Sequence, residues 1–334
     1  MSENLATIQQ ISNIEVHPNA DLLEIASVLG FKCIIKKDQY KIGDVICFII
    51  PDTCLPDKPW AAFYKSKSSR IRAIRLRNVW SEGVIESLEN VEYKGEIVVG
   101  KDITDDIGVY KYEPPTPQDL SAKGNLPFGI IKTDESRYNQ VRDLPFGELV
   151  DVTLKIDGQS GTFYHSKSYE HPTIGFVASH FGITSRSLDI KLDCDNNYTK
   201  VERRYNILER LNNFCKKRDI SLALRGEVYG SNIQAFNINP HKGIPLDWAM
   251  FSVWLIDEKR YARKGEEYYF LNIAEELGLP TVPVLEKDVV LTPELIKKYC
   301  EDMTELNGKM FEGVVIQHRN GSFKVIKKHY DSKK

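Results

Sequence analysis

The chain has 334 residues, of which 42% are hydrophobic and 28% are charged, as in globular proteins and unlike disordered or fibrous ones. Its 45 lysines and arginines nearly balance 47 aspartates and glutamates, and the net charge of -2 excludes a protein that is basic throughout. A local basic patch is still compatible with this total, because a sum says nothing about how charge is distributed. The length suffices for two domains with buried cores.

The sequence predicts neither membrane insertion nor export. No apolar run approaches the length that spans a bilayer, and the first ten residues lack the basic and apolar stretches of a signal peptide. The six cysteines form no Cys-x-x-Cys pair, which favours buried free thiols over a zinc site or a disulfide framework. We expect an intracellular, soluble protein, cytoplasmic or nuclear, that acts as a monomer without a membrane partner.

The first part of the chain predicts a small β-barrel. The apolar stretch Val45–Ile50 follows the turn residues Gly43 and Asp44 and stops at Pro51, which indicates a strand. Farther on, Lys65–Arg77 holds six basic residues and no acid. Its second half alternates apolar and basic residues with one slip, so it predicts a bulged strand with one basic face. The arginines of that face are Arg70, Arg72, Arg75 and Arg77.

A proline-rich segment, Glu113–Pro117, separates this barrel from the rest of the chain. Prolines have fixed dihedral angles and cannot join a ladder of strand hydrogen bonds, so the segment predicts a linker. We place the boundary near residue 118, which gives domains of residues 1–118 and 119–334.

The second domain alternates predicted strands and helices and is therefore expected to be α+β. One helix should begin at Thr199, with Glu202 completing a capping box. Another should begin at Thr292, with Pro293 in its first turn, and end at Asn307–Gly308. The strand candidates are rich in Val, Ile, Phe and Tyr. They are Val150–Ile156, Ser221–Tyr229, Ala249–Ile256, Gly313–Gln317 and Ser322–Ile326.

Several short motifs follow one another along this domain. The first, Lys155-Ile156-Asp157-Gly158, places a lysine at a strand end beside a glycine turn. Alone, that pattern occurs by chance in roughly one chain of this length in fifteen. The later motifs are Thr184-Ser185-Arg186, Arg225-Gly226-Glu227, Phe251 in an aromatic strand, Glu312-Gly313-Val314-Val315, and Lys324 in a final strand.

This ordered set resembles the covalent nucleotidyltransferases, the superfamily of polynucleotide ligases and messenger-RNA capping enzymes. Two further stretches, Pro127–Arg137 and Gly230–Gln234, are similar to elements of RNA ligases. DNA ligases and capping enzymes carry a barrel after the final lysine strand, whereas here the predicted barrel precedes the catalytic domain. The whole resembles the RNA ligase family in which an OB domain precedes an antiparallel-sheet nucleotidyltransferase domain.

The resemblance implies that Lys155 attacks ATP and forms a lysine–AMP adduct. This step needs a neutral amine, so neighbours must lower the pKa of the lysine by burial or by positive charge. Lys324 and a bound metal would supply that charge. Asp157 and Glu312 would hold a Mg²⁺ or Mn²⁺ ion that keeps most of its waters.

Other motif residues would bind the nucleotide. Glu227 would accept a hydrogen bond from a ribose hydroxyl, and Arg186 would bind a phosphate through its forked guanidinium. Phe251 either stacks on the purine or belongs to the core. Arg225 is either a ligand or an ion-pair partner of Glu227.

Two positions depart from the family pattern. Thr153 stands where many relatives use a carboxylate to bind adenine, so only its hydroxyl or backbone is available. The final strand of the family often offers two lysines two residues apart, but here Ser322 precedes Lys324. Whether Lys327 or Lys328 assists Lys324 stays open.

The sequence thus predicts an ATP-dependent RNA ligase that joins 3′-hydroxyl and 5′-phosphate RNA ends through lysine–AMP and an RNA-adenylate. The four arginines of the predicted basic strand would contact RNA phosphates. Alternatively, they form a strand face that is only solvated and binds nothing. The stretch Ile11–Val28 is similar to tRNA-binding OB modules, or is simply the first hairpin of the barrel. Two other functions stay open: a DNA or nick ligase of the same mechanism, and an RNA-binding protein that has lost catalysis.

Overall fold

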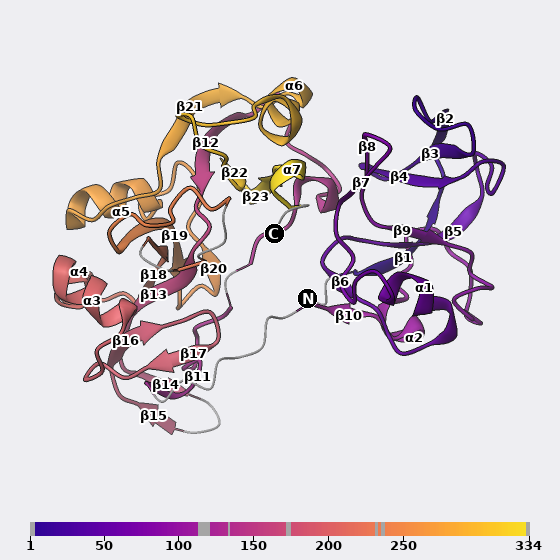
Figure 1. The fold of residues 1–334 in the computed structure, drawn as a ribbon. Coiled ribbons are helices and arrows are strands. Elements are labelled where there is room, and N and C mark those ends of the chain that lie inside the picture. The colour runs from indigo at the N-terminus through magenta and orange to yellow at the C-terminus, as the bar shows by residue number, and fades with distance from the viewer. Residues whose placement is uncertain are drawn as a thin grey trace. The chain divides into compact units, whose positions relative to one another are not determined.

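The computed structural model describes residues 4–112, 121–132, 134–171, 175–230, 233–234 and 238–331. Their contacts divide the chain into two compact units, one of residues 1–115 and 331–334 and the other of residues 116–330 (Figure 1). The predicted linker, Glu113–Pro117, and the boundary near residue 118 lie outside the described residues.

Short antiparallel strands build the N-terminal unit. One sheet joins β1 (Ala6–Gln10), β5 (Val45–Ile49) and β9 (Val84–Glu86), and another joins β2 (Asn13–Val16), β3 (Leu23–Val28) and β4 (Phe31–Lys36). Two strand pairs are β6 (Thr53–Cys54) with β10 (Tyr110–Lys111), and β7 (Ile74–Leu76) with β8 (Val79–Ser81). The helices are η1 (Pro59–Ala61), α1 (Ala62–Lys65) and α2 (Thr104–Ile107). Ile8, Phe31 and Phe48 are buried in the shared core, and the strand predicted at Val45–Ile50 is confirmed.

The basic strand predicted in this unit is wrong in extent. Only Ile74–Leu76 forms a strand, and Arg70 makes an isolated bridge to Cys54. After β7, Arg77 and Asn78 have φ values of 45° and 68° and reverse the chain into β8. Two left-handed residues form the tight turn that matches the twist of paired strands. The four arginines therefore do not share the face of one strand.

The second unit contains two antiparallel sheets. The larger sheet has the strand order β11-β17-β16-β13-β18-β19-β20 and the smaller one β21-β12-β22-β23. In chain order, the larger sheet consists of β11 (Ala122–Asn125), β13 (Gln159–Ser166), β16 (His180–Thr184), β17 (Leu188–Ile190), β18 (Leu222–Tyr229), β19 (Asp247–Leu255) and β20 (Arg260–Tyr261). The smaller sheet consists of β12 (Leu149–Lys155), β21 (Val284–Val290), β22 (Gly313–His318) and β23 (Gly321–Ile326), and β14 (Tyr169–His171) pairs with β15 (Gly175–Val177). All five strands predicted for this domain are confirmed to within two residues.

Helices cover one face of the larger sheet (Figure 1). They are α3 (Asn197–Tyr205), α4 (Ile207–Arg218) and α5 (Phe270–Leu277), of which α4 contacts β13 and β16 while α5 contacts β19. Leu211 and Phe270 enter a core in which the rings of Phe163 and Trp248 meet edge to face, 5.2 Å apart. The remaining helical turns are η2 (Tyr138–Gln140), α6 (Pro293–Lys297), the π-helical η3 (Lys298–Asp302) and α7 (Lys328–Asp331).

The predicted helix at Thr199 begins two residues earlier and is interrupted. Its N-cap is Asn196, whose side chain accepts hydrogen bonds from the backbone of Tyr198 and Thr199. Asn206 adopts φ 50° and ends α3. Glu202 does not cap this helix but accepts the Leu208 N–H of α4 at 3.0 Å. The apolar spacing is therefore shared by two helices.

The second predicted helix begins where the sequence indicated. The Thr292 side chain accepts the Leu295 N–H and Pro293 occupies the first turn. The helix continues as the π-helical turn and ends at Asp302, before the predicted stop at Asn307–Gly308. These two residues instead have positive φ and reverse the chain between Leu306 and Lys309.

Candidate active site

Strand pairing brings the predicted nucleophile to a carboxylate. Lys155 ends β12 opposite Gly313 of β22, and Glu312 directly precedes that glycine. The Lys155 amine therefore donates a hydrogen bond to Glu312 Oε2 at 2.7 Å. Gly313 has φ 155°, and a Cβ there would lie 2.3 Å from the Val325 carbonyl oxygen. This crowding explains why glycine must follow the glutamate.

Strand β18 of the larger sheet supplies Glu227. Its carboxylate accepts the Gly158 N–H at 3.0 Å. A Cβ on Gly158 would lie 2.3 Å from the Val228 carbonyl oxygen, so only glycine allows this approach. Burial raises the pKa of Glu227 to about 8, against the opposing effect of Lys155 and with a further increase from Glu312.

The lysine amine has a raised pKa in this arrangement. Burial acts to lower it, but Glu312, Glu227 and Asp157 together attract the protonated form and outweigh burial. The predicted lowering invokes positive charge from a bound metal, so it stays a prediction. Three nearby carboxylates favour the ammonium form of Lys155.

Asp157 is held by residues that the motif analysis missed. The Tyr330 hydroxyl donates to Asp157 Oδ2 at 2.8 Å, and Asn239 Nδ2 donates to the Asp157 carbonyl oxygen at 3.1 Å. Gln234 Nε2 donates to the Gly158 carbonyl oxygen at 3.2 Å. Gln234 ends the Gly-x-x-Ile-Gln stretch, so its support of the glycine turn was within reach of sequence analysis. Tyr330 belongs to no such motif, so its contact with Asp157 was not predictable from the sequence.

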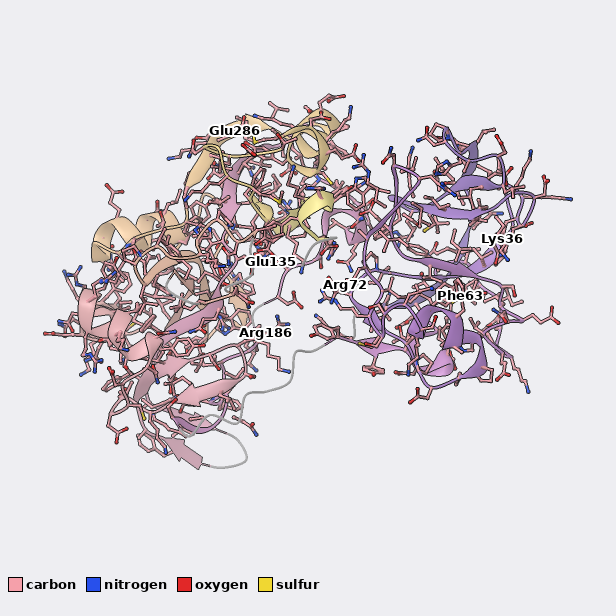
Figure 2. The ribbon with its side chains drawn as sticks, in the orientation of Figure 1. Lys36, Phe63, Arg72, Glu135, Arg186 and Glu286 are labelled. Atoms are coloured by element: carbon pink, nitrogen blue, oxygen red, sulfur yellow. The ribbon has the colours of Figure 1, made fainter. Side chains whose placement is uncertain are left out.

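Two predicted site cations share one carboxylate: Lys324, the predicted source of positive charge, and Arg186, the predicted phosphate ligand. Lys324 Nζ lies 3.3 Å from Asp134 Oδ1, and Arg186 Nη2 lies 3.7 Å from Asp134 Oδ2. Lys324 belongs to β23, whereas Arg186 follows β16 in the larger sheet. Figure 2 labels Arg186 and Glu135, the residue after Asp134. The structure thus brings Lys324 and Arg186 to the same acid.

Arg225 does not form the ion pair with Glu227 that one interpretation predicted. Its guanidinium is 1% exposed and donates to Thr162 Oγ1 at 3.1 Å and to the Ile131 carbonyl oxygen at 2.7 Å. Burial lowers its pKa. Trp254 Nε1 also donates to the Gly129 carbonyl oxygen, at 2.9 Å. Arg225 and Trp254 therefore fix the segment that leads to Asp134.

Two other predicted nucleotide contacts are placed as follows. The Thr153 side chain is buried and donates its hydroxyl to the Val315 carbonyl oxygen at 3.1 Å. Phe251 on β19 is partly buried and packs against the core. The two interpretations of Phe251 both remain compatible with this position.

The lysines after β23 are directed to the π-helical turn. Lys327 Nζ donates to the Met303 carbonyl oxygen and lies 5.4 Å from the centre of the Phe311 ring. Lys328 Nζ donates to Glu301 at 2.8 Å. These contacts anchor the chain after β23, and which of the two lysines assists Lys324 stays open.

The carboxylates near Lys155 suit a hydrated divalent ion. Within the described ranges, no group of three or more His, Cys, Asp or Glu side chains could hold a metal ion. Asp157 and Glu312 offer hard oxygen donors, and both contribute to the field at Lys155. Mg²⁺ commonly binds one or two carboxylates and keeps several waters, so this pair fits such an ion.

In the N-terminal unit, the predicted RNA-binding arginines differ in their exposure and contacts. Arg70 Nε donates to Asp52 at 2.8 Å, and its guanidinium lies over the Tyr112 ring at 4.4 Å. Arg75 lies 5.8 Å from the centre of the Trp80 ring. Arg75 and Arg77 are exposed on the β7–β8 hairpin, whereas Arg70 and Arg72 are half-buried.

Residues 17–21, the His-Pro-Asn-Ala-Asp part of the Ile11–Val28 stretch, support the β7–β8 hairpin. The buried His17 ring lies with Nε2 3.3 Å from the Leu76 carbonyl oxygen. Asn19 Nδ2 donates to the Arg77 carbonyl oxygen at 2.9 Å. The stretch thus connects β2 and β3 and also fixes β7, which agrees with its interpretation as part of the first barrel hairpin.

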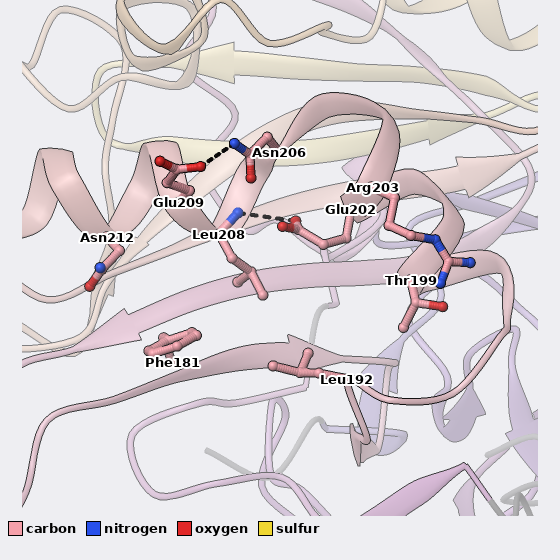
Figure 3. A pocket seen from close by; sticks show the side chains of 9 residues that line it. All are labelled: Phe181, Leu192, Thr199, Glu202, Arg203, Asn206, Leu208, Glu209 and Asn212. Carbon is pink, nitrogen blue, oxygen red and sulfur yellow. Dashed lines mark hydrogen bonds between the residues drawn. The ribbon is translucent and has the colours of Figure 1, made fainter.

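A separate hollow of about 420 Å³ lies between the larger sheet and helices α3 and α4 (Figure 3). Phe181 and Leu192 face the helices across it, and the Glu202–Leu208 hydrogen bond crosses its helical wall. It is lined by Phe181, Leu192, Thr199, Glu202, Arg203, Asn206, Leu208, Glu209 and Asn212. Its lining contains neither Lys155 nor the carboxylates around it, so the hollow is distinct from the Lys155 site.

Among the described residues, no helix is both long and apolar enough to cross a membrane.

Comparison with protein families agrees with the fold and the site. The RNA ligase family model matches residues 148–329, more than half of the chain. An OB-fold domain model matches residues 5–88. No curated protein matches the chain. The chain belongs to the RNA ligase family, and the predicted family and domain types are confirmed.

Solved structures of an RNA ligase from Naegleria gruberi are similar over the full length of the chain. Its complex with pyrophosphate is 28% identical, covers 99% of both chains and has a TM-score of 0.79. A lysine-to-alanine variant with ATP and Mn is 27% identical, covers 99% of both chains and has a TM-score of 0.80. A lysine-to-methionine variant with AMP and Mn is 26% identical, with the same coverage and a TM-score of 0.79. The predicted α+β architecture with an N-terminal OB-like barrel is confirmed.

Proposed function

We propose that this chain, an ATP-dependent RNA ligase, joins RNA ends that carry a 3′-hydroxyl and a 5′-phosphate, with Lys155 as the nucleophile. The observation that carries the proposal is the Lys155–Glu312 contact of 2.7 Å, beside Glu227 and Asp157. Family membership favours RNA over the DNA-ligase alternative. The presence of Lys155, Glu227, Glu312 and Lys324 opposes a protein that only binds RNA.

The reaction proceeds in three transfers. The deprotonated Lys155 amine attacks the α-phosphorus of ATP, a nitrogen–phosphorus bond forms, and pyrophosphate leaves. An oxygen of the RNA 5′-phosphate then attacks the AMP phosphorus and displaces the lysine. Finally, the 3′-hydroxyl of the other end attacks the 5′-phosphate, loses its proton, and AMP leaves.

The side chains around Lys155 divide the work of the first transfer. Glu227 accepts a hydrogen bond from the ribose, while Lys324 and Arg186 bind phosphate oxygens on which negative charge grows. Glu312 and Asp157 hold the divalent ion. When bound, that ion supplies positive charge to offset these carboxylates and the developing charge on phosphorus.

Thr153 and Phe251 would complete the adenosine site. The Thr153 hydroxyl is used by Val315, so contact with adenine falls to its backbone. Phe251 is only partly buried, and its ring would stack on the purine.

The barrel, residues 1–118, would handle RNA, while residues 119–334 carry out the chemistry. The exposed Arg75 and Arg77 support this division, because they present positive charge to solvent where RNA phosphates could bind. Since one unit holds every proposed reacting residue, a monomer suffices, which light scattering would test.

Labelling with ATP tests the proposal. The protein is incubated with Mg²⁺ and α-labelled ATP or GTP and run on a denaturing gel. Label from ATP alone is expected, absent in Lys155→Ala and retained in a matched surface control, Lys200→Ala. Absence of label from both nucleotides, with the wild-type protein folded, would overturn the adenylylation step.

A further inference from the structure

Asp134 lies between two cations to which the proposed function assigns the ATP phosphates. Its two carboxylate oxygens face different partners, Oδ1 toward Lys324 at 3.3 Å and Oδ2 toward Arg186 at 3.7 Å. A phosphate group would present oxygens to the same pair of cations in the same manner. We propose that Asp134 takes the place of the ATP phosphates in the nucleotide-free enzyme and must release Lys324 and Arg186 before the triphosphate binds.

The carboxylate is held in place by its own segment. Upstream, Arg225 and Trp254 bind the carbonyl oxygens of Ile131 and Gly129. Downstream, the Lys324 N–H donates to the Ser136 carbonyl oxygen at 2.9 Å. The position of Asp134 is therefore set by backbone contacts on both sides and not by its two cations alone.

Glu135 adds a further attachment of this segment to β23. The Ser322 hydroxyl donates to Glu135 Oε1 at 2.8 Å. The presence of Ser322 in place of the family lysine thus has a structural consequence: this position holds the Asp134 segment against the strand that carries Lys324. Asp134 consequently remains close to Lys324 in the absence of nucleotide.

The contacts of Asp134 are easily exchanged. At 3.3 and 3.7 Å both contacts with the cations exceed the 2.7–2.9 Å of a strong charged hydrogen bond. Within its own segment, Asp134 Oδ1 also accepts the Glu135 backbone N–H at 2.9 Å. The Asp134 side chain is 27% exposed and that of Arg186 is 39% exposed, so incoming phosphates can reach the pair. Partly exposed ion pairs contribute little to the free energy of folding, and salt screens them. A triphosphate carries more negative charge than one carboxylate and would displace it.

Asp134 is therefore part of the chain itself and competes with the ATP phosphates for Lys324 and Arg186. Before ATP arrives it reduces repulsion between the two cations. Once ATP is bound, the freed carboxylate repels the phosphates and favours departure of pyrophosphate. This inference rests on the proposed roles of Lys324 and Arg186 and adds a residue that weakens, rather than strengthens, nucleotide binding.

The test measures binding of inorganic tripolyphosphate by calorimetry in EDTA, so that neither metal nor base contributes. Asp134→Asn preserves shape but removes the charge, and Asp143→Asn is the matched control on an exposed loop of the same unit. Removing the competitor should tighten binding about three- to tenfold at low salt, the effect expected from one or two partly exposed ion pairs. The gain should shrink in high salt and in an Arg186→Ala background.

The outcomes separate this inference from the proposed function. If Arg186→Ala and Lys324→Ala weaken tripolyphosphate binding but Asp134→Asn leaves it unchanged or weakens it, only the inference fails. If all three variants bind as the wild type does, the phosphate roles of both cations fail, and the inference with them. If Asp134→Asn weakens binding of ATP only when Mg²⁺ is present, Asp134 serves the metal and the competitor role is wrong.

Discussion

Lys155 Nζ and Glu312 Oε2 meet at 2.7 Å although 157 residues separate them in the chain. The contact follows from the pairing of β12 with β22, which sets Lys155 opposite Gly313. A strand register is fixed along its length, so the lysine and the carboxylate are placed together by the fold and need no ligand to bring them together. The nucleophile and a proposed metal ligand are thus preorganised.

Replacing the nucleophile should separate the first transfer from the last. Lys155→Met should form no lysine–AMP adduct, yet it should still seal RNA that carries a preformed 5′-adenylate, because that transfer uses the RNA hydroxyl. Gel assays of label transfer and of sealing measure the two steps. The Glu312 carboxylate, 8% exposed, then loses its cation, so a lower melting temperature is expected. Normal adduct formation by the variant would rule out Lys155.

Glu312 and Glu227 should respond differently to metal. Glu312→Gln removes a proposed metal ligand, so its adenylylation should be slow in Mg²⁺ and partly restored by raised Mn²⁺. Glu227→Gln weakens a contact to the nucleotide and to Gly158, so more metal should restore little. Rates of adduct formation are measured across a titration of each metal. Superimposable titrations of the two variants would contradict this division.

Tyr330→Phe should act through Asp157. The change deletes only the hydroxyl that donates to Asp157 Oδ2 at 2.8 Å, and the loss of a hydrogen bond of this kind costs about 1–2 kcal/mol. We expect a higher Mg²⁺ concentration for half-maximal adenylylation, with KM for ATP measured at saturating metal little changed. Tyr299→Phe, which deletes a hydroxyl bonded to Glu286, is the matched control. Equal metal dependence of both variants would show that Tyr330 only packs in the core and does not affect metal binding through Asp157.

Strand placement was predictable because each strand carries a local pattern of Val, Ile, Phe and Tyr. The order of the motifs was predictable too: Lys155 ends β12, Glu227 lies in β18, and Glu312 directly precedes β22. The Thr292 cap was also visible, since Ser or Thr before Pro at a helix start is a local signal.

What the sequence did not predict depends on contacts between distant segments. Asn206 breaks a helix whose apolar spacing continues across it, so periodicity alone joined α3 and α4. Arg225 and Glu227 are two residues apart on one strand, yet the guanidinium binds Thr162 and Ile131. The role of Tyr330 depends on the end of the chain packing against Asp157.

A buried histidine should make stability depend on pH. His165 on β13 is 2% exposed, and its pKa is lowered chiefly by burial and then by Lys216 and His180. The unfolded chain therefore takes up this proton more readily than the folded one, so stability is lost as pH falls below about 6.5. Urea unfolding from pH 7.5 to 5.5 should show a smaller loss in His165→Gln than in the wild type. Because burial also lowers the pKa of His241 and His318, some dependence should persist. An unchanged pH dependence would assign the effect to those two residues.

The β7–β8 hairpin should affect RNA sealing and not adenylylation. Arg75→Gln with Arg77→Gln removes two exposed charges while Lys155 lies in the other unit, so labelling by ATP should be unchanged. RNA binding should weaken, and its dependence on salt should become shallower by about one unit of slope for each RNA phosphate that is no longer neutralised. Lys216→Gln with Lys217→Gln removes the same charge from α4 and serves as the control.

Arg70→Gln gives the sharper comparison within the barrel. Its guanidinium is already engaged by Asp52 and Tyr112, so the salt slope should change less than for the hairpin pair. Binding is measured by fluorescence anisotropy of labelled RNA across a range of salt concentrations. If the hairpin variant keeps the wild-type slope and seals RNA normally at about 200 mM salt, the hairpin is only a solvated surface. RNA would then be bound by the nucleotidyltransferase unit alone.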